Sequence, residues 1–349
     1  MEMLPVVADT TFKKIAVIDD YISFIWTSRF YAVGDFELCV PVKYASIMQP
    51  NYYIFRTDDE NVGIIEKIDI QNKDDGTEMI IASGRFLGAI LARRIVAEQT
   101  QFNNQYVSAV ISGLITDAII NPSVSAREIS NFRLGTFGNL GEQISTQYTG
   151  TNLMDAVSEL CRTYNLGFKI TIDSGDFVFS LYEGKDRTYN QSANTFAIFS
   201  NTYDNLFSAE YCENHAGIIN AVLVAGEGEG TDRKTVWVQP DSTLSGLNLR
   251  ELYLDQRNVQ SNDGEISPEE YMAQLAGKGA EAITDYTTAF TGSVDFNGVK
   301  YKEDVNLGDI CVIENAEWGI RVNARLVEVI ESTDETGTYS ITPTFGFDN

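Results

Sequence analysis

The sequence predicts a mainly β protein in which two antiparallel β-barrels flank a small α+β module. Short runs of β-branched and aromatic residues, separated by turns rich in Gly, Asn and Asp, fill the first hundred residues and return after about residue 195. Between roughly residues 86 and 190 the apolar residues instead recur at helical spacing. We therefore expect a first barrel over residues 1–97, an α+β insertion over 98–192, and a second barrel with one helix over 193–349, some of whose strands can return to the first barrel.

The strands expected in the two barrels are short apolar runs that end at turn residues. In the first barrel they lie at 14–19, 22–30, 36–40, 52–57, 63–70 and 79–83. Pro41 follows the third of them directly, and proline ends a strand because it has no N–H to donate. In the second barrel the expected strands lie at 220–226, 234–239, 292–295, 309–313, 320–330 and 339–345. Strands and turns that alternate in this way are typical of a meander or a barrel.

The helices expected in the inserted module follow from apolar spacing. A short helix is expected at 87–95 and a longer one at 107–120. The clearest covers 153–164, because its apolar residues share one face and either Thr151 or Asn152 can cap its amino end.

A hairpin and one further helix complete the expected elements. The hairpin pairs 168–172 with 177–182. The helix lies within the second barrel: Ser267 is a good N-cap, Pro268 suits the first helical position and Glu270 completes a capping box.

The charge of the chain is strongly acidic, with 50 acidic against 25 basic residues and a net charge of −25. Tight binding of nucleic acid needs lysines and arginines that displace counterions from phosphates, so sequence-specific nucleic-acid binding is not expected. The same charge suits a wall past which DNA slides without binding and also an ordinary soluble acidic surface, and charge alone does not choose between them. No secretion signal and no apolar run long enough to cross a bilayer is visible, so we expect no stable membrane insertion.

Two segments near opposite ends of the chain resemble each other in layout. In each, a strand that carries a glutamate leads through an acidic turn into a second strand. Glu66 lies 18 positions before Gly84, and Glu328 lies 18 positions before Gly346. Acidic hairpins are common, so chance similarity stands beside the hypothesis of two related barrels. If the barrels are related, three copies of the chain would place six similar units around an axis.

Residues that could carry catalysis or bind a metal are sparse. His215 is the one histidine, and its nearest thiol is Cys212, with no evident third member of a catalytic triad. The four cysteines, Cys39, Cys161, Cys212 and Cys311, form no metal-binding spacing and are expected to be small buried apolar residues. We therefore expect no enzyme, no cofactor and no metal.

Two glycine-containing loops suggest ligands but fit turns better. Gly226-Glu227-Gly228-Glu229-Gly230 lacks the Lys-Ser/Thr of a phosphate loop, and its glutamates would repel phosphate, so a hairpin loop is expected. Asn262-Asp263-Gly264-Glu265 resembles part of a calcium loop without its further ligands, so a turn before the capped helix is expected there.

A basic cluster is conspicuous in this acidic chain. Arg85, Arg93 and Arg94 lie near a run of apolar residues at 87–95. They are candidates for contacts between subunits, with acidic neighbours as partners, and local charge pairing within the chain explains them equally well.

Several short stretches together resemble the siphovirus-type phage tail hub proteins, which are related to the baseplate hubs of contractile tails. The stretches occur in the expected order over nearly the whole chain. They are Tyr31 with Gly34-Asp35-Phe36-Glu37-Leu38 and Pro41, Ile64-Ile65-Glu66, Ser83-Gly84-Arg85 with Leu91 and Arg93-Arg94, Asn220 with Gly226-Glu227-Gly228-Glu229, Arg250-Glu251-Leu252-Tyr253-Leu254-Asp255, Leu307-Gly308-Asp309, and Pro343-Thr344-Phe345-Gly346.

The resemblance implies a structural virion protein built from two tail-tube-like β-barrels with an inserted α+β module. Three such chains would form a pseudo-sixfold ring at the distal end of the tail, assembled in the host cytoplasm. Its partners would be the tail tube or distal tail protein on one side and the tail tip or spike protein on the other, with DNA passing through the lumen. None of the matching stretches holds a catalytic residue of that family, and no downstream hydrolase domain is expected.

Two alternative functions stay open at this stage. A tail-tip cell-wall hydrolase would need a pair of carboxylates in a cleft. A carbohydrate-binding receptor module would be favoured if Trp26, Trp237 and Trp318 are exposed, although tryptophans among so many strands are more often in the core.

Overall fold

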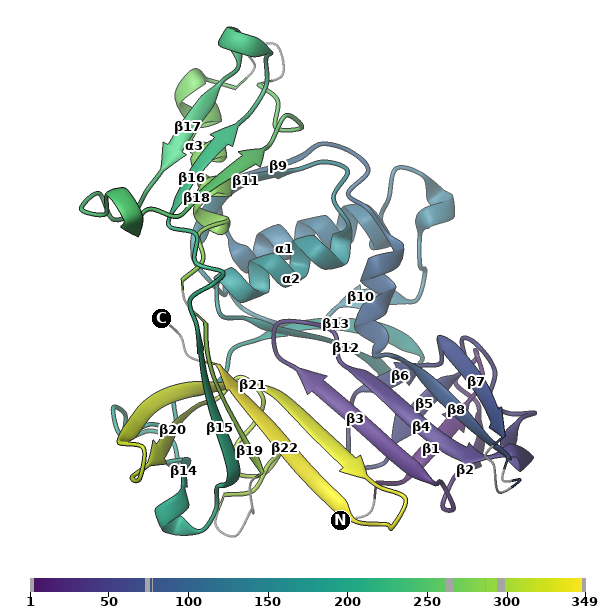
Figure 1. Cartoon of the computed structure of the whole chain (residues 1–349). Coiled ribbons are helices and arrows are strands. Elements are labelled where there is room, and N and C mark those ends of the chain that lie inside the picture. The colour runs from purple at the N-terminus through teal and green to yellow at the C-terminus, as the bar shows by residue number, and fades with distance from the viewer. Residues whose placement is uncertain are drawn as a thin grey trace.

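The computed structural model describes residues 3–72, 76, 78–261, 266–285, 287–293 and 299–346. Figure 1 shows β-sheets from both ends of the chain at the base, a helical module above them, and a small sheet with its own helix farthest from the base. We call the base the first and second β units, the helical part the module, and the small sheet with its helix the arm.

The first β unit consists of two sheets that face each other. Phe24, Trp26 and Phe36 of one sheet pack with Val7 and Ile54 of the other, and all five are buried. Large apolar side chains on alternate positions give each sheet one apolar face, and the two faces bury each other. One sheet has the order β3 (Ser23–Arg29), β4 (Asp35–Pro41), β8 (Glu78–Arg85) and β7 (Lys67–Asn72); the other has the order β2 (Lys14–Val17), β1 (Pro5–Ala8), β5 (Tyr53–Arg56) and β6 (Val62–Ile64).

The second β unit continues the larger sheet of the first. Its long strand β21 pairs with β3, so both ends of the chain share one ten-stranded sheet. Phe199, Leu326, Val329 and Phe345 form its buried core. Its strands are β14 (Ile198–Ser200), β15 (Phe207–Asn214), β19 (Thr287–Ser293), β20 (Ile310–Asn315), β21 (Ile320–Thr333) and β22 (Tyr339–Gly346).

The module is an α+β unit whose two helices share an apolar core with its sheets. The side chain of Asn152 caps α2 by accepting a hydrogen bond from the Met154 N–H at 3.0 Å, so the expected cap is confirmed. Leu153, Val157 and Leu160 are the buried face of this helix. The elements are β9 (Thr100–Tyr106), α1 (Val107–Ile115), β10 (Phe132–Leu134), β11 (Gln143–Tyr148), α2 (Leu153–Thr163), β12 (Gly167–Asp173) and β13 (Asp176–Tyr182).

The arm is inserted between β15 and β19. Its sheet has the order β17 (Thr235–Val238), β16 (Ala221–Ala225) and β18 (Glu251–Asp255), and α3 (Pro268–Glu281) covers one face. The Ser267 hydroxyl accepts a hydrogen bond from the Glu270 N–H at 3.2 Å, which confirms the expected N-cap. Residues 262–265, the calcium-like stretch, lie outside the described residues.

Two expected helices are corrected by the structure. The segment at 87–95 is a 3₁₀ helix over Leu87–Arg93. The segment at 107–120 is α-helical only to Ile115 and ends in a π-helical turn over Thr116–Ile120. There the Thr116 hydroxyl donates to the Ser112 carbonyl at 2.7 Å, and such side-chain bonds compete with the regular helical pattern.

Strands with polar sequences are not predicted by the apolar pattern. They include β9, β11, β15 and β18, and β19 begins at Thr287, before the expected start at 292. Residues 294 and 295 of that expected strand lie outside the described residues. These strands form because neighbouring strands satisfy their backbone hydrogen bonds, a contribution that side-chain periodicity does not report.

The mainly β fold with an α+β insertion is confirmed, but the expected barrels are open in the described part of the chain. The large sheet runs from β15 at one end to β7 at the other, and these two strands do not pair with each other. Closing a sheet needs its two end strands to meet, and within one chain these two lie at opposite ends. The boundaries at 97/98 and 192/193 stay a prediction. No helix in the described ranges has the length and apolar character needed to cross a membrane.

Two glycines allow the linker after β13 to cross the second β unit. A Cβ atom on Gly184 would lie 1.7 Å from the carbonyl oxygen of Gly308. Gly308 itself has a positive φ of 94°, and a Cβ there would lie 2.3 Å from the Phe30 ring. The two segments touch here backbone to backbone, and only glycine permits so close an approach.

We predict that Gly184→Ala destabilises the protein by about 3 kcal/mol, because the added methyl group would clash with the backbone at Gly308 and must displace one of the two segments. The matched control is Gly138→Ala, since a Cβ at Gly138 meets nothing within 4 Å. Urea unfolding followed by circular dichroism measures both variants. Equal stability of the two variants would contradict this close approach.

Candidate functional site

The candidate site is the junction where β21 of the second β unit pairs with β3 of the first. The antiparallel register runs from Glu328 opposite Arg29 to Thr333 opposite Phe24. Arg29 donates from Nε to Glu328 Oε2 at 2.7 Å and also forms an ion pair with Asp35. An arginine between two carboxylates holds three strands together at the outer face of the sheet.

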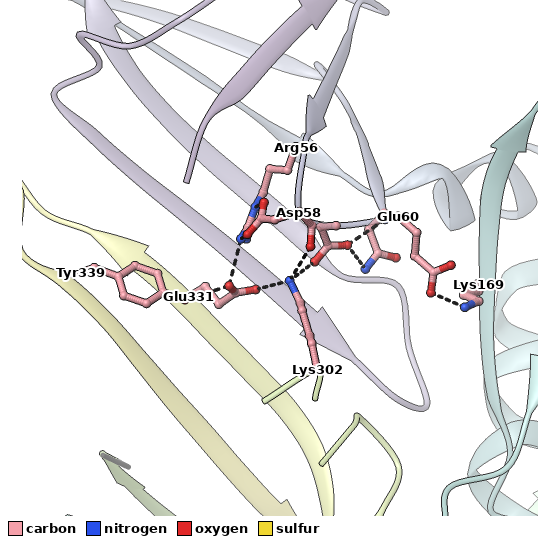
Figure 2. Close-up of polar contacts among 9 residues, drawn as sticks. Arg56, Asp58, Glu60, Lys169, Lys302, Glu331 and Tyr339 are labelled. Atoms are coloured by element: carbon pink, nitrogen blue, oxygen red, sulfur yellow. Dashed lines mark hydrogen bonds and ion pairs between the residues drawn. The ribbon is translucent and has the colours of Figure 1, made fainter. Parts of the chain in front are cut away.

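A cluster of charged residues lies buried beneath this junction. Figure 2 shows Glu331 of β21 between two cations that come from different parts of the chain. Arg56 of β5 donates from Nη2 to Glu331 Oε1 at 2.9 Å, and Lys302 donates from Nζ to Glu331 Oε2 at 3.1 Å. The side chains of Arg56 and Glu331 are 0% and 2% exposed, so this is a fully desolvated ion pair.

Further acceptors and donors balance the charges of this cluster. Arg56 also donates to Asp58 Oδ2 at 2.6 Å, and Lys302 also donates to Asp59 Oδ2 at 2.7 Å. The Tyr339 hydroxyl donates to Glu331 Oε1 at 2.9 Å. Three carboxylates therefore surround two cations, and this pairing offsets the desolvation cost of burying them.

Burial and pairing act in opposite directions on the pKa values of this cluster. Burial is the largest single effect on Arg56 and disfavours its charge, but the hydrogen bonds and the charges of Asp58 and Glu331 together outweigh it and raise the pKa of Arg56. Burial also opposes the charge of Asp58, and Arg56 and Lys302 overcome that effect and lower the pKa of Asp58. Both shifts favour the charged forms of Arg56 and Asp58.

A cleft of about 480 Å³ opens beside the cluster, where the first β unit, the second β unit and the module meet. Its acidic lining residues are mostly engaged in ion pairs. Glu60 pairs with Lys169 of the module, as Figure 2 shows, and Asp309 pairs with Arg187 at 2.8 Å. The lowered pKa of Asp58 is the opposite of what a general acid needs. Among the described residues, no group of three or more His, Cys, Asp or Glu is arranged to hold a metal ion.

The three arginines that the sequence indicated, Arg85, Arg93 and Arg94, lie between the end of β8 and the end of the 3₁₀ helix that follows it. Arg85 donates from Nε and Nη2 to both oxygens of Glu66, each at 2.8 Å. These bonds, with a smaller contribution from Arg93, lower the pKa of Glu66. Arg93 is exposed, whereas Arg94 donates to the carbonyl of Arg127 at 3.2 and 3.1 Å. Local charge pairing is thus observed for Arg85, whereas Arg94 bonds to backbone carbonyls, and contact with another subunit stays a prediction.

The possible nucleophile pair does not converge. Cys212 lies within β15, whereas His215 follows the last residue of that strand, Asn214. His215 Nε2 instead lies 2.5 Å from Glu213 Oε1. Cys39, Cys161 and Cys311 are buried as expected, but Cys212 is exposed because it lies in a strand at the end of the sheet.

The tryptophans divide between core and surface. Trp26 is fully buried, and the guanidinium of Arg56 lies over its ring at 5.6 Å. Trp237 in β17 and Trp318 are 54% and 47% exposed. The Gly226–Gly230 stretch connects β16 to β17 as the expected hairpin loop.

The sequence did not point to Arg56, Lys302 or Glu331. One signal was present for Arg56: it alternates with Ile54 along β5, so its side chain shares the buried face of that strand. A charged residue at such a position implies a buried partner. No local pattern identifies that partner, because Glu331 lies 275 residues away.

The comparisons with known proteins agree with this architecture. The family model of the siphovirus ReqiPepy6 Gp37-like protein matches residues 4–347. The chain belongs to this family. The resemblance to siphovirus tail proteins is thereby confirmed. No curated protein sequence matches the chain.

Solved structures of tail proteins share the fold of this family member across almost its full length. The tail protein from Neisseria meningitidis MC58 has a TM-score of 0.61 at 14% identity, covering 100% of this chain and 97% of that one. The 43 kDa tail protein of prophage MuSo2 from Shewanella oneidensis has a TM-score of 0.55 at 14% identity, covering 98% and 97%. Prophage tail protein gp18 from Listeria monocytogenes EGD-e has a TM-score of 0.53 at 14% identity, covering 99% and 94%.

We predict that Glu331→Gln destabilises the protein by about 3 kcal/mol, because Arg56 and Lys302 lose the carboxylate that they share in the interior. Glu60→Gln is the matched control, because Glu60 forms an ion pair with Lys169 and its side chain is 62% exposed. An exposed ion pair contributes little, so we expect this variant to lose less than about 1 kcal/mol of stability. Urea unfolding at neutral pH measures both. A Glu331→Gln variant as stable as the control would show that the buried cluster does not support the junction.

Proposed function

We propose that this phage tail protein is the structural hub of the tail, a ring of three copies that joins the tail tube or distal tail protein to the tail tip or spike. The observation that carries the proposal is that the two β units repeat one strand order. In the first unit the order is β3-β4-β8-β7, and in the second it is β15-β19-β22-β21, with antiparallel pairing throughout.

The repeat supports a ring because each chain then supplies two similar units side by side. Three chains would supply six units around the axis. The join between the two units of one chain is the β21–β3 pair, and the two outer strands β7 and β15 are left at the ends of the sheet. A chain with complementary surfaces at its two ends forms rings when the rotation between copies closes.

The proposed ring would surround a channel through which DNA passes. The net charge of −25 supports a wall that repels phosphates rather than binding them. We place the ring at the distal end of the virion tail, after assembly in the host cytoplasm, and the exposed Arg93 near Arg85 and Arg94 is a candidate contact with an acidic neighbouring subunit.

We propose that this hub is not an enzyme. The pairing of the carboxylates in the cleft supports this, since a cell-wall hydrolase needs one carboxylic acid that stays protonated and one free carboxylate. Peptidoglycan zymography with the purified protein is the direct test, and a cleared zone would contradict the proposal.

A second candidate function is carbohydrate binding by the arm. On the sheet face opposite α3, Trp237 and Tyr253 flank Leu223 across three strands. The two aromatic side chains are 54% and 55% exposed, and exposed aromatic rings of this kind can stack on sugars. A host-polysaccharide pull-down that is lost in Trp237→Ala would support this function.

We predict that the purified protein forms a particle with three times the 38.8 kDa mass of one chain. Light scattering coupled to size-exclusion chromatography, or native mass spectrometry, measures the mass. Three is expected because each chain fills two of six similar positions. A hexamer of chains or a strictly monomeric protein would contradict the hub.

A further inference from the structure

Two strands lie at the ends of the ten-stranded sheet and, among the described residues, pair with a neighbouring strand on one side only. These are β7 in the first β unit and β15 in the second. Several of their side chains are exposed. In β7, Ile70 is 67% exposed, although it pairs with Ile80 and lies on the apolar face of the sheet. In β15, Glu210 and Cys212 are exposed, and Tyr211 is half-buried against the core of the second unit. Exposed strands at a sheet end are ready to pair with another strand.

The internal repeat fixes which residues of the two units correspond. Two matching rows of paired residues cross the sheet: Trp26–Phe36–Gly84 on β3, β4 and β8, and Tyr211–Phe290–Phe345 on β15, β19 and β22. Trp26 and Phe36 belong to the core of the first unit, and Tyr211 and Phe345 pack in the core of the second. The correspondence therefore directs the same face of each sheet toward its core.

The correspondence extends to β7 and β21, and it corrects the expected match of Glu66 with Glu328. Ser83 precedes Gly84 and pairs with Lys67, and Thr344 precedes Phe345 and pairs with Glu328. Lys67, and not Glu66, is therefore the counterpart of Glu328. The shift arises because each strand is irregular at this point, with a break between β6 and β7 and a bulge between Leu326 and Glu328.

We propose that β7 of one copy pairs antiparallel with β15 of a second copy, in the register that β21 and β3 use within one chain. This inference rests on the proposed hub and specifies its contact between subunits. Along the sheet, β7 runs in the same direction as β21, and β15 in the same direction as β3, so the antiparallel alternation continues from copy to copy.

The transferred register places an apolar pair at the new contact. Glu331 opposite Trp26 in the chain corresponds to Ile70 of one copy opposite Tyr211 of the other. Both side chains lie on the face that covers the core, so the contact would bury the exposed Ile70 and join the two apolar cores. A buried ion cluster stabilises the join within the chain, whereas an apolar pair would stabilise the join between chains.

On the other face, the register places Asp69 opposite Cys212. This pair corresponds to Ile330 opposite Thr27. The Phe30 N–H donates to the Val327 carbonyl at 2.9 Å, so Phe30 and Val327 form a hydrogen-bonded pair. Hydrogen-bonded and non-hydrogen-bonded pairs alternate along an antiparallel ladder. Ile330 and Thr27, three positions along, therefore form a non-hydrogen-bonded pair. Residues at such positions have Cα atoms about 4.5 Å apart, which lies within the range that a disulfide spans.

The closing experiment is a disulfide crosslink in the full chain that uses the native Cys212. We expect Asp69→Cys, treated with diamide as the acceptor of the two electrons and two protons, to give linked dimers and trimers on a non-reducing gel that a reducing agent dissolves. Asp69→Cys combined with Cys212→Ser should give none. Ile68→Cys is the register control, because its side chain leaves on the opposite face of β7 and should not crosslink.

Light scattering on the same samples separates this inference from the hub itself. A trimer in which Asp69→Cys does not crosslink, or in which Ile68→Cys crosslinks instead, would overturn the register and leave the hub standing. A protein that stays monomeric would overturn the hub.

A second variant tests the apolar pair. Ile70→Asp should raise the concentration at which trimers dissociate by at least about tenfold, because a carboxylate would be buried against Tyr211. Val124→Asp is the matched control, since Val124 is 56% exposed and precedes the 3₁₀ turn Ser125–Arg127 of the module, outside β7 and β15. Unchanged assembly of Ile70→Asp would count against the proposed contact.

Discussion

The pairing of β21 with β3 is the contact on which the rest of the structure depends. It joins residues 299 positions apart, as in the ion pair of Arg29 with Glu328, and combines strands of both β units in one ten-stranded sheet. The module and the arm are insertions within this frame. Because the sheet connects the first strands of the chain to the last, the fold is complete only when both ends of the chain have met.

The charges beneath this contact specify its register. A hydrophobic junction would tolerate a slip along the strands, since any slip by two residues keeps the same face buried. Glu331 reaches both Arg56 and Lys302 in only one register, and any other would leave buried charges without partners. The cluster thus contributes specificity at a place where three segments distant in sequence meet.

The repeat of the two β units explains why the sheets are open. In the described part of the chain, each unit has one outer strand that pairs with the other unit and one, β7 or β15, that has a neighbour on one side only, so the large sheet ends in two unlike edges. Natural proteins protect exposed edges because they promote unspecific pairing. Both edges here carry charged residues, among them Lys67, Asp69 and Glu210, which favours a specific partner over indiscriminate association.

Much of the local structure was determined by the sequence itself. The cap at Asn152, the cap at Ser267 and the alternating strands of the first β unit follow from short-range physics, in which a residue's neighbours decide its conformation. The polar strand β15 could not be predicted in this way, because its pairing with β19 decides its conformation. The π-helical turn after Ile115 could not be predicted either, because a side-chain hydrogen bond there competes with the regular helix. Only the tertiary structure decided that Arg56 pairs with Glu331. It also decided the one-residue shift that makes Lys67 the counterpart of Glu328. Long-range pairs and bulges leave no periodic signal in a single sequence, and they become visible only when the strands lie side by side.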